Sequence, residues 1–367
     1  MGFFHPTKNR PSRPIATYPE SISQPYPYHT TQMSRKLDNR VIEALKHGDH
    51  DRIFRDISSA LLLRFDDLLE FEFLGASHPL GEDVTFLQDG NALAIPKLRL
   101  IQAFLPARTL LMRYLCDEGQ ASPDEILRAT AVILLMDPEH LTAANTRKRI
   151  LVRQNQEKTR YALLEEKYLI DSLLTSHLHR HTKSPILWSH RRWLMLRLRE
   201  AGHSPDLAGE LRRIVHISGE RHPRNYYAWD HARFLLRAFD HTSPAAPSQL
   251  RLTLVQDTKK WCFNHHDDTS GWSFLGFLLR ECEEAAAKPM FAEVCGYAKA
   301  YTWRNESVWY FLRNLAREVS LAGQELGDFH HVIQTLASGL GDENEEKRVL
   351  LQATRWACPD ATPSVGH

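Results

Sequence analysis

Histidine and carboxylate side chains gather at two places where their spacing could hold a divalent metal ion. His177, His179 and His181 recur at every second residue, and His265-His266 precede Asp267-Asp268. Converging imidazole and carboxylate groups are typical zinc ligands. The first group falls near an expected helix C-terminus, where positive charge is favourable, and the second lies in a short loop where Asp268 can cap a helix. We therefore predict no metal site in this chain.

Other residues that could carry chemistry do not form a known pattern. The cysteines are scattered, with no C-x-x-C pair and no histidine at zinc-finger spacing, which favours reduced thiols in a cytoplasmic protein. Phosphate-loop, nucleophile-elbow and H-E-x-x-H motifs are missing from the sequence. The formal net charge of +1 gives no overall attraction for nucleic acid, and no apolar run is long enough to span a membrane.

Four tryptophans recur at near-constant intervals and indicate a tandem repeat. Trp188, Trp229, Trp272 and Trp309 are 41, 43 and 37 residues apart, and the frame extends back to Ala144. A repeat of this length is typical of stacked helical hairpins, each of which buries its apolar face against the next. The sequence therefore predicts an all-α fold, an α-α superhelix (solenoid) of about five to seven helical hairpins.

The repeat also explains how each second helix should begin and which face it should bury. The residue four before the tryptophan position is predicted to cap the helix. In the five repeats these residues are His140, Ser184, Asn225, Asp268 and Asn305. Positions 0, +3, +6 and +7 share one helical stripe, predicted to be buried, and position +3 is Arg147 or Arg191 in the first two repeats. We expect every tryptophan to be a core residue, including those outside the frame, which are Trp193, Trp261, Trp303 and Trp356.

The chain divides into five predicted parts. Residues 1–33 form a Pro/Tyr-rich tail expected to be disordered. Residues 34–121 hold N-terminal helices with an irregular or hairpin insertion near 71–95, where Asp89-Gly90 marks a turn. Residues 122–322 hold the repeats, 323–358 form capping helices, and 359–367 are a tail. The predicted pairs are about 124–137 and 141–155, 159–180 and 185–200, 205–219 and 226–240, 248–263 and 269–283, and 288–302 and 306–321.

The repeated block resembles that of protein prenyltransferase α subunits, whose repeats read N-x-x-x-W-x-x-R-x-x-L. The matching stretches are S-P-I-L-W-S-H-R-R-W, which begins at Ser184, and R-N-Y-Y-A-W, which begins at Arg224. Within that family the chain is most similar to the α subunit repeat-containing proteins, through L-L-M-D-P from Leu134 and T-A-A-N-T-R-K from Thr142. The resemblance covers roughly residues 97–320.

The resemblance implies a crescent that wraps a barrel-shaped β subunit. In that family the β subunit carries a zinc ion, which turns a substrate cysteine into a thiolate that attacks the isoprenoid. No cofactor is then expected in this chain. A family lysine five residues before the second-repeat tryptophan reaches the diphosphate leaving group, and Lys183 occupies that position here. The resemblance thus predicts Lys183 as a catalytic residue that offsets charge on the leaving group.

The third repeat supplies the predicted substrate-binding residues Arg224, Tyr226 and Tyr227, because this block lines the substrate groove in the family. The family usually has lysine where Arg224 stands, and arginine keeps the charge. Ile186 replaces a glutamine that binds the C-terminal carboxylate of short peptide substrates, and isoleucine cannot donate that bond. This departure favours an enzyme that recognises a whole folded substrate, or one that has its own anchor for the substrate elsewhere.

We therefore expect an α-type subunit of a heterodimeric protein geranylgeranyltransferase, inactive alone and cytoplasmic. Its expected partners are a β subunit, an isoprenoid diphosphate and a protein with a C-terminal cysteine. Two alternatives stay open. One is a helical-repeat scaffold that has lost the chemistry, as the Ala144 substitution and the non-arginine residues at positions 232, 275 and 312 suggest. The other is an adaptor that presents substrate to another prenyltransferase.

Overall fold

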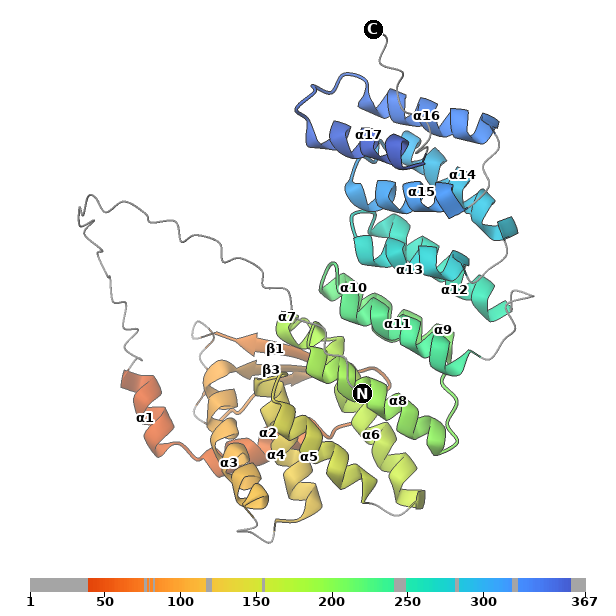
Figure 1. Ribbon diagram of the computed structural model, residues 1–367. Coiled ribbons are helices and arrows are strands. Elements are labelled where there is room, and N and C mark those ends of the chain that lie inside the picture. Colours follow the sequence, from red (N-terminus) through yellow and green to blue (C-terminus); the bar gives the residue numbers. More distant parts are fainter. Residues whose placement is uncertain are drawn as a thin grey trace, which may run out of the picture.

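The chain folds into a curved stack of paired helices with a small sheet beside its N-terminal end (Figure 1). The structure is a computed structural model, and it describes residues 39–75, 78, 80–81, 83–116, 121–153, 156–240, 249–280, 284–318 and 323–357. The predicted all-α solenoid is confirmed. Both predicted tails, 1–33 and 359–367, lie outside the described residues.

Three helices and the sheet precede the repeats. The helices are α1 (Asn39–His47), α2 (His50–Ala60) and α3 (Lys97–Leu115). The strands are β1 (Glu70–Leu74), β2 (Leu87–Asp89) and β3 (Ala92–Pro96), in the order β1-β3-β2. The predicted hairpin is confirmed: β2 and β3 are antiparallel, and Gly90 turns the chain at a φ of 55°. Strand β1 extends the insertion by pairing parallel to β3.

Six helical pairs follow within the described residues, and the first five agree with the repeat frame. The first two pairs are α4 (Pro123–Met136) with α5 (Leu141–Val152), and α6 (Gln156–Leu174) with α8 (Pro185–Glu200). In the third pair the first helix has three consecutive parts, α9 (Leu207–Glu210), η1 (Leu211–His216) and α10 (Ile217–Arg221), and the second helix is α11 (Tyr226–Phe239). The last three pairs are α12 (Gln249–Asn264) with α13 (Thr269–Arg280), α14 (Glu284–Ala300) with α15 (Glu306–Glu318), and α16 (Gly323–Ala337) with α17 (Glu345–Ala357). The short helix α7 (His179–Thr182) lies between α6 and α8.

One predicted helix is too long. The sequence predicts a helix over 159–180, whereas α6 ends at Leu174. The hydroxyls of Thr175 and Ser176 donate to the carbonyls of Asp171 and Leu173, both at 2.8 Å. Such side-chain bonds compete with continuation of the helical ladder. The chain therefore leaves the helix six residues early and forms a longer loop before α8.

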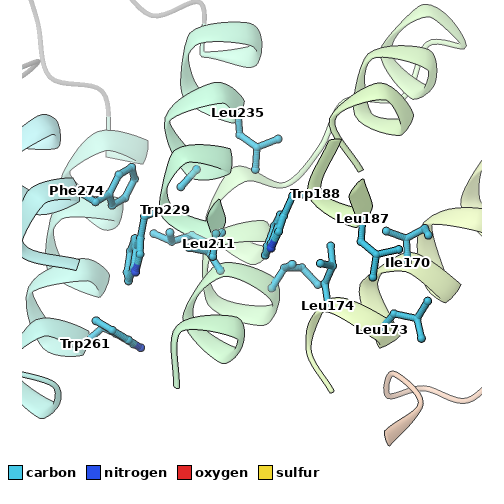
Figure 2. Close-up of a cluster of buried hydrophobic side chains, with 14 of the residues drawn as sticks. Ile170, Leu173, Leu174, Leu187, Trp188, Leu211, Trp229, Leu235, Trp261 and Phe274 are labelled. Carbon is cyan, nitrogen blue, oxygen red and sulfur yellow. The ribbon is translucent and has the colours of Figure 1, made fainter. Parts of the chain in front are cut away.

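The core follows the tryptophan frame along the stack. Trp188, Trp229, Trp272 and Trp309 are all buried, which confirms them as core residues. Figure 2 shows Trp229 between α11 and its neighbours, with its ring 4.8 Å from Trp261 and 5.3 Å from Phe274. Rings at these distances add to the free energy gained by burying apolar surface. Trp356 contradicts the expectation, because it is 43% exposed at the end of the array.

Candidate functional site

Three of the four predicted site side chains meet at the ends of the second and third helical pairs. Lys183 follows α7, and Tyr226 and Tyr227 begin α11. The Lys183 Nζ lies 5.7 Å from the centre of the Tyr226 ring, within range of a cation–π interaction. The Tyr226 and Tyr227 rings lie 4.1 Å apart, and Tyr226 is half exposed. The sequence separation of more than forty residues is thus closed by the packing of adjacent repeats.

A shared carbonyl sets the position of Lys183. The carbonyl oxygen of Thr182 accepts hydrogen bonds from the Trp188 indole and the Asn225 amide, both at 2.9 Å. The same arrangement recurs two pairs later, where His266 O accepts from Trp272 Nε1 at 3.0 Å and from Asn305 Nδ2 at 2.6 Å. The tryptophan of one repeat and the asparagine of the next therefore hold one loop, which explains their linked spacing.

Two cap residues of the repeat complete this support. Ser184 accepts from the Leu187 amide at 3.1 Å and donates to Pro138 O at 3.0 Å. Asn225 accepts from the Ala228 amide at 3.4 Å, so its predicted capping role is confirmed. Both helices that flank Lys183 therefore begin at fixed points, and each cap is worth about 1 kcal/mol.

Arg224 lies beside this group in an unusual backbone conformation. Its φ of 59° is in the left-handed region, which is uncommon for a residue with a β carbon. The Arg224 amide donates to Asp268 Oδ2 at 2.6 Å, so the cap residue of the next repeat holds this conformation. The Arg224 side chain is exposed. Within the described parts of the chain, neither Arg224 nor Lys183 forms an ion pair with a carboxylate.

A pair of histidines borders the site, and sequence reasoning missed one of them. His179 Nδ1 and His222 Nδ1 are 3.3 Å apart. Burial and the nearby charges of Lys183 and His179 lower the pKa of His222. His222 lies two residues before the R-N-Y-Y-A-W stretch and has no spacing signal, so only the structure places it here. The site therefore combines two cationic side chains, two tyrosines and two imidazoles, of which Arg224, Tyr226 and His179 are exposed.

The two histidine-containing groups considered in the sequence do not bring their side chains together. His181 points away from His179, because its Nε2 lies 2.9 Å from Leu135 O, and burial lowers its pKa to about 4. His177 is exposed on the loop. In the second group, Asp268 caps α13 by accepting from the Gly271 amide at 3.0 Å. Among the residues that the structure describes, no three or more histidine, cysteine or acidic side chains are placed to hold a metal ion.

Arg191, on α8, organises a buried ionic cluster. Its Nε donates to Asp171 Oδ1 at 2.7 Å, a second nitrogen donates to Glu210, and a third donates to His231 Nε2 at 2.5 Å. Although burial opposes ionisation, Arg191 and Lys167 hold the pKa of Glu210 at about 2. The cluster links α6, α8, α9 and α11. Its geometry supports the structural role predicted for Arg191.

A cavity of about 800 Å³ lies on another side of this cluster, between the loop before β1, α6 and the third helical pair. Lys167, Asp171 and Glu210 line it, together with the π-helical turn η1. Lys183, Arg224, Tyr226 and Tyr227 do not line this cavity. The sequence offers no signal for the π turn, because its hydrophobic spacing continues that of an ordinary helix.

Comparisons with known proteins find similar helical-repeat sequences. Residues 187–301 match the family described as the ECM9 middle domain. The chain is 31% identical to protein ECM9 of Saccharomyces cerevisiae over 52% of its own length and 50% of that protein. It is 27% identical to human protein prenyltransferase alpha subunit repeat-containing protein 1, over 46% of this chain and 43% of that protein. Pig geranylgeranyl transferase type-2 subunit alpha is 32% identical over 42% of this chain and 25% of its own length.

These matches cover only part of each relative. The chain aligns with half or less of the length of each of these relatives. The matched family range, 187–301, lies within the helical repeats and includes Arg224, Tyr226 and Tyr227 but not Lys183. No helix in the described parts of the chain is long and apolar enough to cross a membrane.

Proposed function

We propose that this chain, a relative of the protein prenyltransferase α subunit repeat-containing proteins, acts as the α-type subunit of a heterodimeric protein prenyltransferase. The finer proposal is a geranylgeranyl-transferring enzyme that is inactive without its β subunit. The name of the pig relative supports the choice of isoprenoid. The observation that carries the proposal is the contact of Lys183 with the half-exposed ring of Tyr226, two residues from the exposed Arg224.

The chain's own residues would bind and orient the diphosphate. Lys183 and Arg224 supply positive charge that no described carboxylate neutralises. The negative charge on a diphosphate grows as the carbon–oxygen bond breaks, so fixed cations stabilise the transition state more than the ground state. Tyr226 and Tyr227 would pack beside the isoprenoid or donate to phosphate oxygens through their hydroxyls. A zinc ion on the β subunit would supply the thiolate nucleophile.

Ile186 supports recognition of a folded substrate. Its side chain is partly buried and packs against the core, so it offers no donor to a peptide carboxylate. A substrate anchored only by its last residues would lack this contact. We therefore propose that affinity comes from a wider protein surface, and that a C-terminal cysteine is the acceptor.

Reconstitution with prenyltransferase β subunits tests the proposal. The full chain is co-expressed with candidate β subunits, and transfer of labelled geranylgeranyl from its diphosphate to a protein acceptor is measured. We expect a stable heterodimer and turnover that requires both chains. Lys183→Ala should lower kcat by about 100-fold without loss of the heterodimer, as expected for a lost transition-state contact.

Lys260→Ala is the matched control, because Lys260 is exposed on α12 and distant from the site in the repeat frame. It should leave kcat unchanged. Unchanged turnover in Lys183→Ala would remove Lys183 from the mechanism. Failure of every β subunit to copurify would refute the enzyme proposal and favour a helical-repeat scaffold.

A further inference from the structure

A second regularity runs along the later helix of each pair. Taking the tryptophan position as zero, positions +4 and +8 lie one turn apart and project from one face of the helix. Of the ten residues at these positions in the five repeats, seven are basic and three are not, namely Gly276 at +4 and Val152 and Leu196 at +8. The basic residues are Lys148, Arg192, Arg233 and Arg313 at +4, and Arg237, Arg280 and Arg317 at +8. We call these seven residues the basic row.

Aromatic rings of the next helix hold members of the basic row. Lys148 lies 5.8 Å from the ring of Trp193, and Arg192 lies 5.2 Å from the ring of Phe234. Arg233 lies 5.7 Å from the Phe277 ring. In each case, a cation at position +4 lies over the aromatic ring at position +5 of the following repeat. The contact is therefore part of the repeat and extends across α5, α8, α11 and α13.

The row continues toward the C-terminus without changing face. Arg237 lies 5.4 Å from the Phe277 ring, and Arg313 and Arg317 lie 5.1 and 5.2 Å from the ring of Trp356. The helices α8, α11, α13, α15 and α17 contact one another in that order. Figure 1 shows α11, α13 and α15 following one another toward the C-terminal end. The exposed Trp356 thus has a place at the end of the row.

The charge of this face is not balanced by its own carboxylates. In the described part of the chain, only Asp230 and Glu318 form ion pairs with members of the row, with Arg192 and Arg280 respectively. Burial lowers the pKa of Arg233 and the charges of Arg237 and Arg280 lower it further, while Asp230 opposes the shift. The cations therefore lie close enough to repel one another, although the whole chain has a net charge of only +1.

We propose that the basic row is a docking surface for a folded protein that presents a face of carboxylates. Guanidinium groups already held on rings lose little further freedom on binding, and their forked donors match carboxylate geometry. A single-stranded nucleic acid fits less well, because the rings that could stack on bases lie under guanidinium groups. The inference goes beyond the proposed function, since it requires neither an isoprenoid nor a β subunit.

Binding of a defined acidic probe tests the inference on the full chain. The probe is a labelled helical peptide of about 20 residues with glutamate at every fourth position, read by fluorescence anisotropy, and its glutamine counterpart is the neutral control. We expect salt-sensitive binding of the glutamate peptide only. The triple variant Arg237→Glu, Arg280→Glu, Arg317→Glu should weaken binding at least about tenfold, because it reverses exposed charges of the row.

A second triple variant separates the surface from net charge. Arg55→Glu, Arg108→Glu and Arg160→Glu change the total charge equally at exposed sites elsewhere, and should retain binding. Thermal melts check that both variants fold. Equal loss in the two variants, or no loss in the first, overturns the inference. Tighter binding of an oligothymidine of similar charge, lost only in the first variant, would assign the surface to nucleic acid instead.

Discussion

The N-terminal repeats (α4–α11) and the C-terminal repeats (α12–α15) share one helical frame, but they differ in whether a charged or an apolar side chain is buried at the same position. At position +3 the first two repeats bury Arg147 and Arg191, whereas the last two bury Leu275 and Leu312. All four side chains are almost fully buried. The frame therefore fixes which face of the helix is inside, but it does not require that face to be apolar.

The difference lies in what each helix packs against. Arg147 donates to Glu166 Oε1 on the following helix α6 and to Thr130 Oγ1 on the preceding helix α4, both at 2.8 Å, so the Glu166 carboxylate matches its charge. Leu312, by contrast, belongs to the cluster of buried apolar side chains. A buried ion pair contributes little net stability relative to an apolar core, yet it fixes which helices can pair. The polar core is beside the candidate site, where precise placement matters most.

Removal of Arg191 should cause the largest loss of stability among the changes that test this difference between the repeats. Arg191→Leu reproduces the residue type of the C-terminal repeats but leaves the buried Asp171 and Glu210 with Lys167 as their only remaining cationic partner among the described residues. We expect a loss of about 3–5 kcal/mol in the free energy of unfolding, measured by urea denaturation. Arg197→Leu is the control on the same helix, because the Arg197–Glu200 pair is partly exposed and should contribute about 1 kcal/mol or less. Equal losses in the two variants would contradict the structural importance of the cluster.

Protonation should weaken the N-terminal repeats before the C-terminal ones. Burial lowers the pKa of His181 to about 4, and it also lowers the pKa values of His190 and His231. The unfolded chain binds these protons near pH 6.5, so stability is fully present above that pH and falls as the pH drops toward 4. For His181 alone the loss at pH 4 is about 3 kcal/mol.

His181→Gln tests this dependence, because glutamine stays neutral and can still donate to a backbone carbonyl. We expect the variant to lose less stability than the wild type between pH 6.5 and 4, in urea titrations at each pH. His47→Gln, at an exposed histidine, should not change the slope. Hydrogen exchange should locate the loosening in α4–α11. Identical slopes in the wild type and His181→Gln would exclude His181 as the source.

The repeat frame predicted most of the fold because its determinants are local. Cap residues, the tryptophan positions and the buried stripe each follow from helical geometry, and the Asp89-Gly90 turn follows from backbone preference. The end of α6 was missed because the Thr175 and Ser176 bonds depend on three-dimensional hydroxyl placement. Trp356 was misassigned because the stack ends there and no further helix covers it among the described residues.

The candidate site was only partly predictable for a similar reason. Lys183 and Tyr226 could be named from their register, but their proximity depends on the Asn225 bond to the preceding loop. His222 and the bond from the Arg224 amide to Asp268 have no sequence signal, since they join groups from different repeats. Contacts between repeats therefore complete the site, and a single-repeat pattern cannot specify them.

The smallest expected effect comes from relieving backbone strain, and it can be compared at the candidate site and in the C-terminal repeats. Arg224 and Thr302 are the two described non-glycine residues with positive φ, at 59° and 57°, one near the site and one in the C-terminal repeats. The Arg224 amide has a 2.6 Å bond to Asp268, whereas the Thr302 amide has only a 3.4 Å bond to Lys299 O.

Thr302→Gly should therefore raise the free energy of unfolding by about 1 kcal/mol, because a β-branched residue is costly in the left-handed region. Arg224→Gly should give a similar gain, since glycine relieves the same conformation and keeps the amide donor, but it removes the charge that the site would use. If Arg224→Gly is more stable but binds inorganic diphosphate more weakly, the arginine side chain contributes to ligand binding at the cost of a strained backbone. Destabilisation by Arg224→Gly would instead show that the Arg224 side chain contributes packing contacts to the fold.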